Sequence, residues 1–330
     1  MTTAVAAPER SEKELLIATK AFTVEDPARS RRESIISFAL QIATTVAIVY
    51  TPWWPVQLLL SVLAGLLVVR TFILYHDVMH GAMLRGAKVW RAIYSAYGVL
   101  VLTPPNVWKE THNYHHAHTA KLIGSNIGSY PMVTPKMYAA LPPFMRWLYR
   151  AARHPLNIAC AALTVFLIGM CVRPFLRNPK KMWDSALAFV LFWVISGTLA
   201  YFGYWNALVF AYWLPMVIGC ALGAYLFYAQ HNYPGVKVAP RETWTFKGAS
   251  LESSSYMTMS PLMHWMTANI GYHHVHHLNA AIPYYRLPEA MASIPELQKE
   301  PETSLKLKDI VAAFKLKLWD PDRNEMVGVP

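Results

Sequence analysis

The sequence predicts an all-α integral membrane protein with four transmembrane helices in two hairpins, additional interfacial helices and a cytoplasmic helical cap. The first indication is composition, because 55% of the 330 residues are hydrophobic and only 15% are charged, unlike an ordinary soluble protein. The second is the presence of apolar runs long enough to cross a hydrocarbon layer of about 30 Å. The third is that Lys and Arg, with the exception of Arg70, border these runs instead of interrupting them, as the positive-inside rule requires.

The first hairpin is predicted from residues 35–54 and 56–75, which are joined by a turn between Pro52 and Pro55. Only Arg70 interrupts these two spans. It lies within about two helical turns of the expected cytoplasmic end. We therefore expect its long side chain to carry the charge to the membrane interface.

The second hairpin is predicted from a block between Ser185 and Ala229 that contains no charged residue. The stretch from Gly203 to Asn206 is its expected turn, which gives spans at 185–202 and 205–229. Neither hairpin turn carries a charge, so both turns are expected outside and both chain ends in the cytoplasm.

The remaining chain is expected to lie in the cytoplasm or at its interface. Residues 1–34 form a cytoplasmic N-terminal segment without the basic start and apolar core of a cleaved signal peptide. Residues 35–330 form one membrane domain, whose cytoplasmic cap comprises about 76–184 and 230–330. The cap is expected to include the following segments: a re-entrant or interfacial run from Pro155 to Val172, an interfacial run from Trp90 to Leu102, and short helices near 287–298 and 305–318.

Several functional classes are excluded by composition and motifs. The net charge of +11 does not indicate nucleic acid, because the chain has no basic module interleaved with aromatic residues. No glycine-rich phosphate loop is present, so no nucleotide site is expected. The three cysteines, Cys160, Cys171 and Cys220, stand singly in apolar stretches, which favours neither a disulfide framework nor a thiolate metal site.

Histidine clusters are the main chemical signal. The chain has thirteen histidines, and eight of them form three clusters: His76 and His80; His112, His115 and His116; His273, His276 and His277. Spacings of three or four residues place side chains on one face of a helix, so each cluster can direct its imidazoles at one point. A ninth, His231, directly follows the last span at the depth of His76. These nine histidines predict a metal site.

The other histidines are treated differently. His118 and His274 lie roughly 110° from the faces of their clusters, so they are expected at the surface or in hydrogen bonds to the ligands, while His154 and His264 are left unassigned. Imidazole binds zinc, copper, iron and nickel. Eight or nine histidines are too many for one tetrahedral zinc ion but suit two ions of higher coordination number. Two such ions with open positions indicate dioxygen chemistry.

Three sequence runs resemble the histidine boxes of membrane fatty-acid desaturases, particularly bacterial acyl-lipid desaturases: HDVMH, WKETHNYHHAHT and NIGYHHVHHLNAAIPYYRLPEA. The resemblance covers nearly all of the chain from about residue 55. It implies two irons that activate O2, removal of hydrogen from two adjacent methylenes and release of two waters. It also implies this ligand set: His76, His80, His112, His115, His116, His231, His273, His276 and His277. Asp77 matches the acid of the first box and is expected to hydrogen-bond a ligating imidazole, with Glu110 and Asn269 as further candidates.

The same resemblance implies the partners. The chain has no His-Pro-Gly-Gly heme motif, so a separate ferredoxin or cytochrome is expected as electron donor, attracted by a basic cytoplasmic surface. The substrate is expected to be a fatty-acyl lipid held in an apolar tunnel. The protein is expected in a bacterial inner membrane, with its active site facing the cytoplasm.

Two alternatives remain open. A hydroxylase, ketolase or alkane monooxygenase would share the same ligands and differ only in the fate of the carbon radical. A metal transporter is the alternative of another class, but its sites usually lie near the membrane midplane with acidic residues, and the run from Ser185 to Ala229 contains none.

Overall fold

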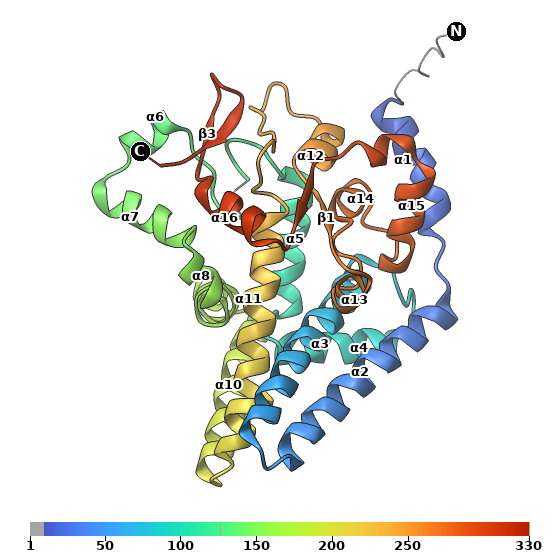
Figure 1. Cartoon of the computed structure of the whole chain (residues 1–330), viewed down its shortest axis with the longest axis vertical. Coiled ribbons are helices and arrows are strands. Elements are labelled where there is room, and N and C mark those ends of the chain that lie inside the picture. The colour runs from blue at the N-terminus through green and yellow to red at the C-terminus, as the bar shows by residue number, and fades with distance from the viewer. Residues whose placement is uncertain (1–9, 126, 330) are drawn as a thin grey trace.

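The computed structural model describes residues 10–125 and 127–329, and within this part of the chain four helices are long and apolar enough to cross a membrane. These are α2 (Pro27–Tyr50), α3 (Trp54–His80), α10 (Trp183–Tyr201) and the run Ala207–Ala229, which consists of π-helical η3 (Ala207–Trp213) and α11 (Leu214–Ala229). They form the lower half of the molecule, and the cap lies above them (Figure 1). The predicted all-α membrane fold is confirmed.

Local signals explain where the first hairpin begins and ends. Helix α2 starts at Pro27, earlier than the predicted span, because the Asp26 side chain accepts hydrogen bonds from the amides of Ala28 and Arg29. Helix α3 ends at His80 and is capped by Gly81, which has a φ of 73° and so adopts the left-handed conformation that favours glycine. Consequently α3 remains helical through both histidines of the first cluster.

Small residues let α3 and α11 approach closely. A Cβ atom at Gly65 would lie 2.6 Å from Ile218 Cγ2, and one at Gly219 would lie 2.7 Å from Val68 Cγ1. Close approach at small residues is a common way to pack helices in a membrane. This contact fixes the position of α3, which carries His76, relative to α11, which precedes His231.

Arg70 lies inside the protein, where other side chains pair with its charge. Its side chain is fully buried, with Nη2 2.7 Å from Glu33 Oε2 and Nε 3.0 Å from Ser37 Oγ. The guanidinium also lies 3.8 Å from the centroid of the Trp265 ring. A buried charge needs such a partner, and the early start of α2 supplies it because Glu33 falls within that helix.

The two expected interfacial regions are helical. Helix α4 (Lys88–Leu100) corresponds to the first region. The second consists of α8 (Pro155–Ala159), π-helical η2 (Ala162–Val172) and α9 (Arg173–Arg177). Figure 1 shows the α8 region end on beside α11, whereas α10 and α11 run along the long axis. This transverse direction accords with an interfacial or re-entrant segment.

The cap is a set of short elements around the upper ends of α3 and α11 (Figure 1). Its helices are α5 (Pro105–His118), α6 (Pro135–Ala140), α7 (Pro143–Ala152), α12 (Phe246–Glu252), α13 (Pro261–Met266), α14 (His273–Leu278), α15 (Leu287–Ser293) and α16 (Leu307–Lys315), with 3-10 turns η4 (Tyr284–Arg286) and η5 (Pro295–Gln298). Ile294 separates α15 from η5 within the helix predicted near 287–298.

Two short sheets, which the sequence did not predict, complete the cap. Strand β1 (Tyr256–Thr258) pairs in parallel with β2 (Glu302–Ser304), and β3 (Leu318–Asp320) pairs antiparallel with β4 (Glu325–Val327). Each strand has three residues, so these sheets do not change the fold class.

The described part of the N-terminal segment packs against the cap through α1 (Glu12–Thr19) and η1 (Lys20–Thr23). Asn279 Nδ2 donates to Thr19 Oγ1 at 2.9 Å, and Arg286 Nη1 donates to the Ala21 carbonyl at 3.0 Å. These contacts hold the segment against the loop that follows the third histidine cluster.

Candidate metal centre

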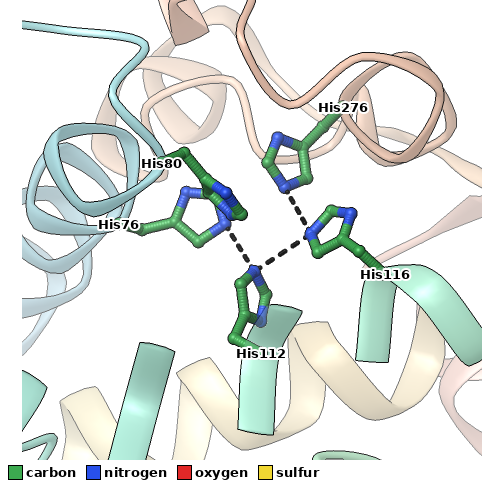
Figure 2. Close-up of side chains that lie close together, drawn as sticks. All are labelled: His76, His80, His112, His116 and His276. Atoms are coloured by element: carbon green, nitrogen blue, oxygen red, sulfur yellow. Dashed lines mark hydrogen bonds between the residues drawn. The ribbon is translucent and has the colours of Figure 1, made fainter. Parts of the chain in front are cut away.

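The structure gathers five of the nine predicted histidines into a first group, shown in Figure 2. His76 and His80 come from α3, His112 and His116 from α5, and His276 from α14. One nitrogen of each lies within 4.8 Å of one nitrogen of every other. The Nε2 atom of His112 is 3.0 Å from that of His76 and 3.1 Å from that of His116, which in turn is 3.1 Å from that of His276.

The remaining four predicted histidines form a second group. They are His115 of α5, His231 just after α11, and His273 and His277 of α14, again with nitrogens within 4.8 Å of one another. The Nε2 atom of His115 is 3.1 Å from that of His231 and 3.3 Å from that of His277. The Nε2 atom of His273 is 2.9 Å from that of His231 and 3.1 Å from that of His277.

The clusters do not each converge on one point, as the sequence led us to expect. Residues four apart on a helix differ by about 40° in direction, whereas those three apart differ by about 60° in the opposite sense. Helices α5 and α14 therefore direct an i, i+4 pair to one group and the remaining histidine to the other. The first group takes His112, His116 and His276, and the second takes His115, His273 and His277. Both helices thus hold the two groups side by side.

Hydrogen bonds on the outer nitrogens make the inner nitrogens available to a metal. His76 Nδ1 lies 3.0 Å from Asp77 Oδ1, and His231 Nδ1 lies 2.9 Å from the Ser253 carbonyl oxygen. Because these oxygens accept hydrogen bonds, we assign the proton to Nδ1 and a lone pair to Nε2 in each ring. A shared cation satisfies such converging lone pairs, so both groups are able to bind a metal ion.

The closest nitrogens in each group are spaced like ligands of a single metal ion. At a metal–nitrogen distance of about 2.1 Å, adjacent ligands lie about 3.0 Å apart on an octahedron and about 3.4 Å apart on a tetrahedron. The seven closest Nε2–Nε2 pairs are 2.9 to 3.3 Å apart, and the ligand atoms of each group all lie within 4.8 Å of one another. These spacings allow each group to hold one metal ion.

Burial keeps these imidazoles neutral, which is the form that binds metal. Desolvation lowers the pKa of His231 to about 4. Desolvation, followed by repulsion from neighbouring histidines, holds the pKa of His112 and His276 well below the usual range. Binding a metal at neutral pH would therefore displace few protons from the rings.

The three further candidates from the sequence occupy different places. Asp77 bonds His76 as expected, and its Oδ2 accepts from the Tyr284 amide at 2.7 Å. Glu110 instead pairs with Lys181 at a half-exposed surface, because residue 110 points about 200° away from residue 112 on α5. Asn269 donates to the Tyr284 carbonyl at 3.2 Å, so it supports the loop that holds Asp77.

The histidines outside the nine lie apart from both groups. His118 stacks on Tyr114 with ring centroids 3.9 Å apart. His274 is fully buried, with Nε2 3.1 Å from the Leu297 carbonyl oxygen, so it is neither a surface group nor bonded to a candidate ligand. His154 Nδ1 accepts from the Leu156 amide at 3.2 Å and caps α8.

Three contacts of the site were not predicted. The Trp108 ring stacks on His112 with centroids 4.5 Å apart, and its position one helical turn before His112 could have indicated this contact. The Ser253 carbonyl and the Tyr284 amide are backbone groups, so no residue type identifies them in advance.

A cavity of about 460 Å³ begins at the histidines and extends between α3 and α11. His76, His112 and His273 line one part. The rest is lined mainly by apolar residues, including Val68, Phe72, Gly219, Cys220, Gly223 and Phe227, together with polar side chains such as Asn157, Thr164 and Arg173. On α3, the distance from His76 down to Val68 corresponds to about 12 Å along the helix. The cavity therefore suits an extended apolar chain that passes beside the histidines.

Four candidate membrane helices beneath two groups of buried histidines define a membrane protein with a histidine-rich metal-binding site. The sequence model of the family described as fatty acid desaturase matches residues 52–305. The chain therefore belongs to the fatty acid desaturase family and is an oxidoreductase, which confirms the resemblance noted in its sequence.

Individual relatives agree with this assignment. The chain is 28% identical to a fatty acid desaturase of Bacillus subtilis over 272 residues, which cover 82% of this chain and 77% of the relative. It is 25% identical to an sn-1 oleoyl-lipid 12-desaturase of Picosynechococcus, over 82% and 78% of the two chains. It is also 26% identical to an sn-1 acyl-lipid omega-3 desaturase (ferredoxin) of Synechocystis, over 76% and 68%.

Proposed function

We propose that this protein introduces a cis double bond into a fatty-acyl chain of a membrane lipid, using O2, external electrons and two histidine-bound iron ions. The observation that carries this proposal is the position of two groups of five and four histidines beside an apolar cavity. Similarity to enzymes named as acyl-lipid desaturases supports the substrate class.

The reaction balances as R–CH2–CH2–R′ + O2 + 2 electrons + 2 protons giving R–CH=CH–R′ + 2 H2O. Two bound irons would supply the activation of O2 that the reaction needs. The five histidines of the first group would hold one ion and the four of the second group the other. Asp77 and the Ser253 carbonyl orient one ring in each group by fixing its proton on Nδ1.

The cavity supplies the other requirement of the reaction. A methylene in an acyl chain is unactivated, so the two adjacent methylenes that react must be held close to the oxidant. Apolar walls on α3 and α11 would bind the hydrocarbon and exclude water from the site.

Electrons would come from a separate ferredoxin or cytochrome, and two relatives carry ferredoxin in their names. A net charge of +11 favours a small acidic carrier. The uncharged hairpin turns support a topology in which the histidines face the cytoplasm of a bacterial inner membrane.

Lipid analysis of a host that expresses the protein tests this function. Expression should add a double bond to membrane acyl chains, and the His115→Ala variant, inserted at the same level, should add none. Hydroxylated or keto lipids would instead indicate one of the related oxygenases. Unchanged lipids together with metal uptake into the cell would favour a transporter.

A further inference from the structure

A second, smaller pocket of about 40 Å³ reaches the second histidine group from the side of the cap. His115, His231, Tyr130, Arg153 and Asn232 are among the residues that line it. Tyr130 also lines the large apolar cavity, so it stands where the two spaces meet. The volume suits a water molecule or a small polar group.

Arg153 carries a buried charge that no acidic side chain neutralises within residues 10–125 and 127–329. Arg153 is 1% exposed to solvent. Nη1 donates to the Pro131 carbonyl at 2.7 Å and Nη2 to Asn232 Oδ1 at 2.5 Å, but the buried Nε has no partner. Burial, and then the Arg153 charge, lower the pKa of Lys317 to about 8. A guanidinium buried in this way favours an oxygen ligand that bears negative charge.

Tyr130 provides a second unused donor in the same pocket. Its hydroxyl oxygen is buried and has no hydrogen-bond partner. Burial raises the pKa of the phenol, so the hydroxyl stays protonated and can donate. Buried donors are nearly always paired in proteins, and two unpaired donors lining one pocket indicate a missing acceptor.

We propose that Tyr130 and Arg153 bind the oxygen-bearing polar end of the acyl substrate, which rests on the function proposed above. The ligand chemistry is an ester carbonyl or an anionic carboxylate or phosphate oxygen. The pocket and the cavity also share Ser129 and Phe227. One molecule can therefore place its polar end at Tyr130 and its hydrocarbon beside His112 and His273. Anchoring the polar end fixes which methylenes stand at the metal centre.

Replacing Tyr130 by Phe tests this site, because it removes only the hydroxyl. Tyr225→Phe is the matched control, since the Tyr225 hydroxyl is also buried without a partner but the residue is not among those that line either space. We expect Tyr130→Phe to raise KM roughly three- to tenfold and to spread the double bond over neighbouring positions. Tyr225→Phe should match the wild type in both respects.

Three substrates with different polar ends identify the bound group: a long-chain fatty acid, its methyl ester and a phospholipid. Arg153→Lys should weaken an anionic substrate that binds there more than it weakens the methyl ester. An equal loss for all three substrates assigns the acyl carbonyl oxygen, which is the group that they share. Binding of the fatty acid or lipid to zinc-loaded protein gives a readout without turnover. The site is refuted if Tyr130→Phe, with normal metal content, keeps wild-type KM, affinity and double-bond position. A wild-type protein that forms no double bond would instead refute the proposed function.

Discussion

Replacing Asp77 by Asn should weaken metal binding in the first histidine group while leaving the fold intact. Both carboxylate oxygens are used, Oδ1 by His76 Nδ1 at 3.0 Å and Oδ2 by the Tyr284 amide at 2.7 Å. An amide has only one acceptor oxygen. If the Asn oxygen accepts from His76, the bond to the Tyr284 amide is lost. If it accepts from the Tyr284 amide, the Asn NH2 group faces His76 Nδ1 and forces the proton of His76 onto the nitrogen that faces the metal. Hydrogen bonds to charged groups contribute about 1.5–3 kcal/mol. This corresponds to a roughly 10- to 100-fold loss of affinity, as for other groups that orient metal-binding histidines.

Competition with a chelator measures this change directly, with cobalt or iron titrated into metal-free protein. Asp184→Asn is the matched control, because Asp184 is also buried and accepts a backbone hydrogen bond, from Asn106 at 2.8 Å, but lies away from the histidines on α10. If Asp77→Asn bound both metal ions as tightly as the wild type, or if Asp184→Asn were weakened equally, the orienting role assigned to Asp77 would be wrong.

Three other predictions concern single positions. His231→Ala should lower the iron content from about two to about one per chain, because one of four ligands in the second group is lost; full iron content with ordinary activity would remove His231 from the site. His276→Ala should abolish product, whereas His274→Ala should lose about 1–3 kcal/mol of stability and keep its iron and appreciable activity. Total loss of activity at both positions would contradict the placement of His274 outside the two groups. Gly223→Leu should shift product toward shorter acyl chains, because a Cβ there meets nothing within 4 Å and the residue lines the cavity. Gly197→Leu is the control, because a Cβ at Gly197 also meets nothing within 4 Å but the residue is not among those that line the cavity; it should leave the chain length of the product unchanged. Equal chain-length profiles for the two variants would refute this use of the cavity.

The positions of the four spanning helices could be predicted because long apolar runs have few alternatives in a membrane. Helix α2 extends beyond the predicted span at 35–54, because Asp26 caps a helix that also includes Arg31, Arg32 and Glu33. This extension carries Glu33, the partner of Arg70. Pairing between distant elements, such as Glu33 with Arg70, leaves no local pattern in the sequence.

The arrangement of the candidate metal site could also be predicted only in part from the sequence. All nine predicted histidines come together, but their division into two groups follows from the directions of His112 and His115 on α5, which spacing alone had merged. Glu110 was expected near the ligands, but on α5 it points about 200° away from His112 and pairs with Lys181. Ser253 and Tyr284 act through a backbone carbonyl and a backbone amide, which are not specific to these residue types, so only the fold could identify them.

The metal content of purified, active protein tests the central claim most directly. Iron and zinc should be measured on the same sample for which double-bond formation is recorded with O2 and an electron donor. The account predicts close to two irons per chain, with activity lost when iron is removed and restored when it is returned. A protein that forms double bonds with one tightly bound zinc and no iron would contradict it.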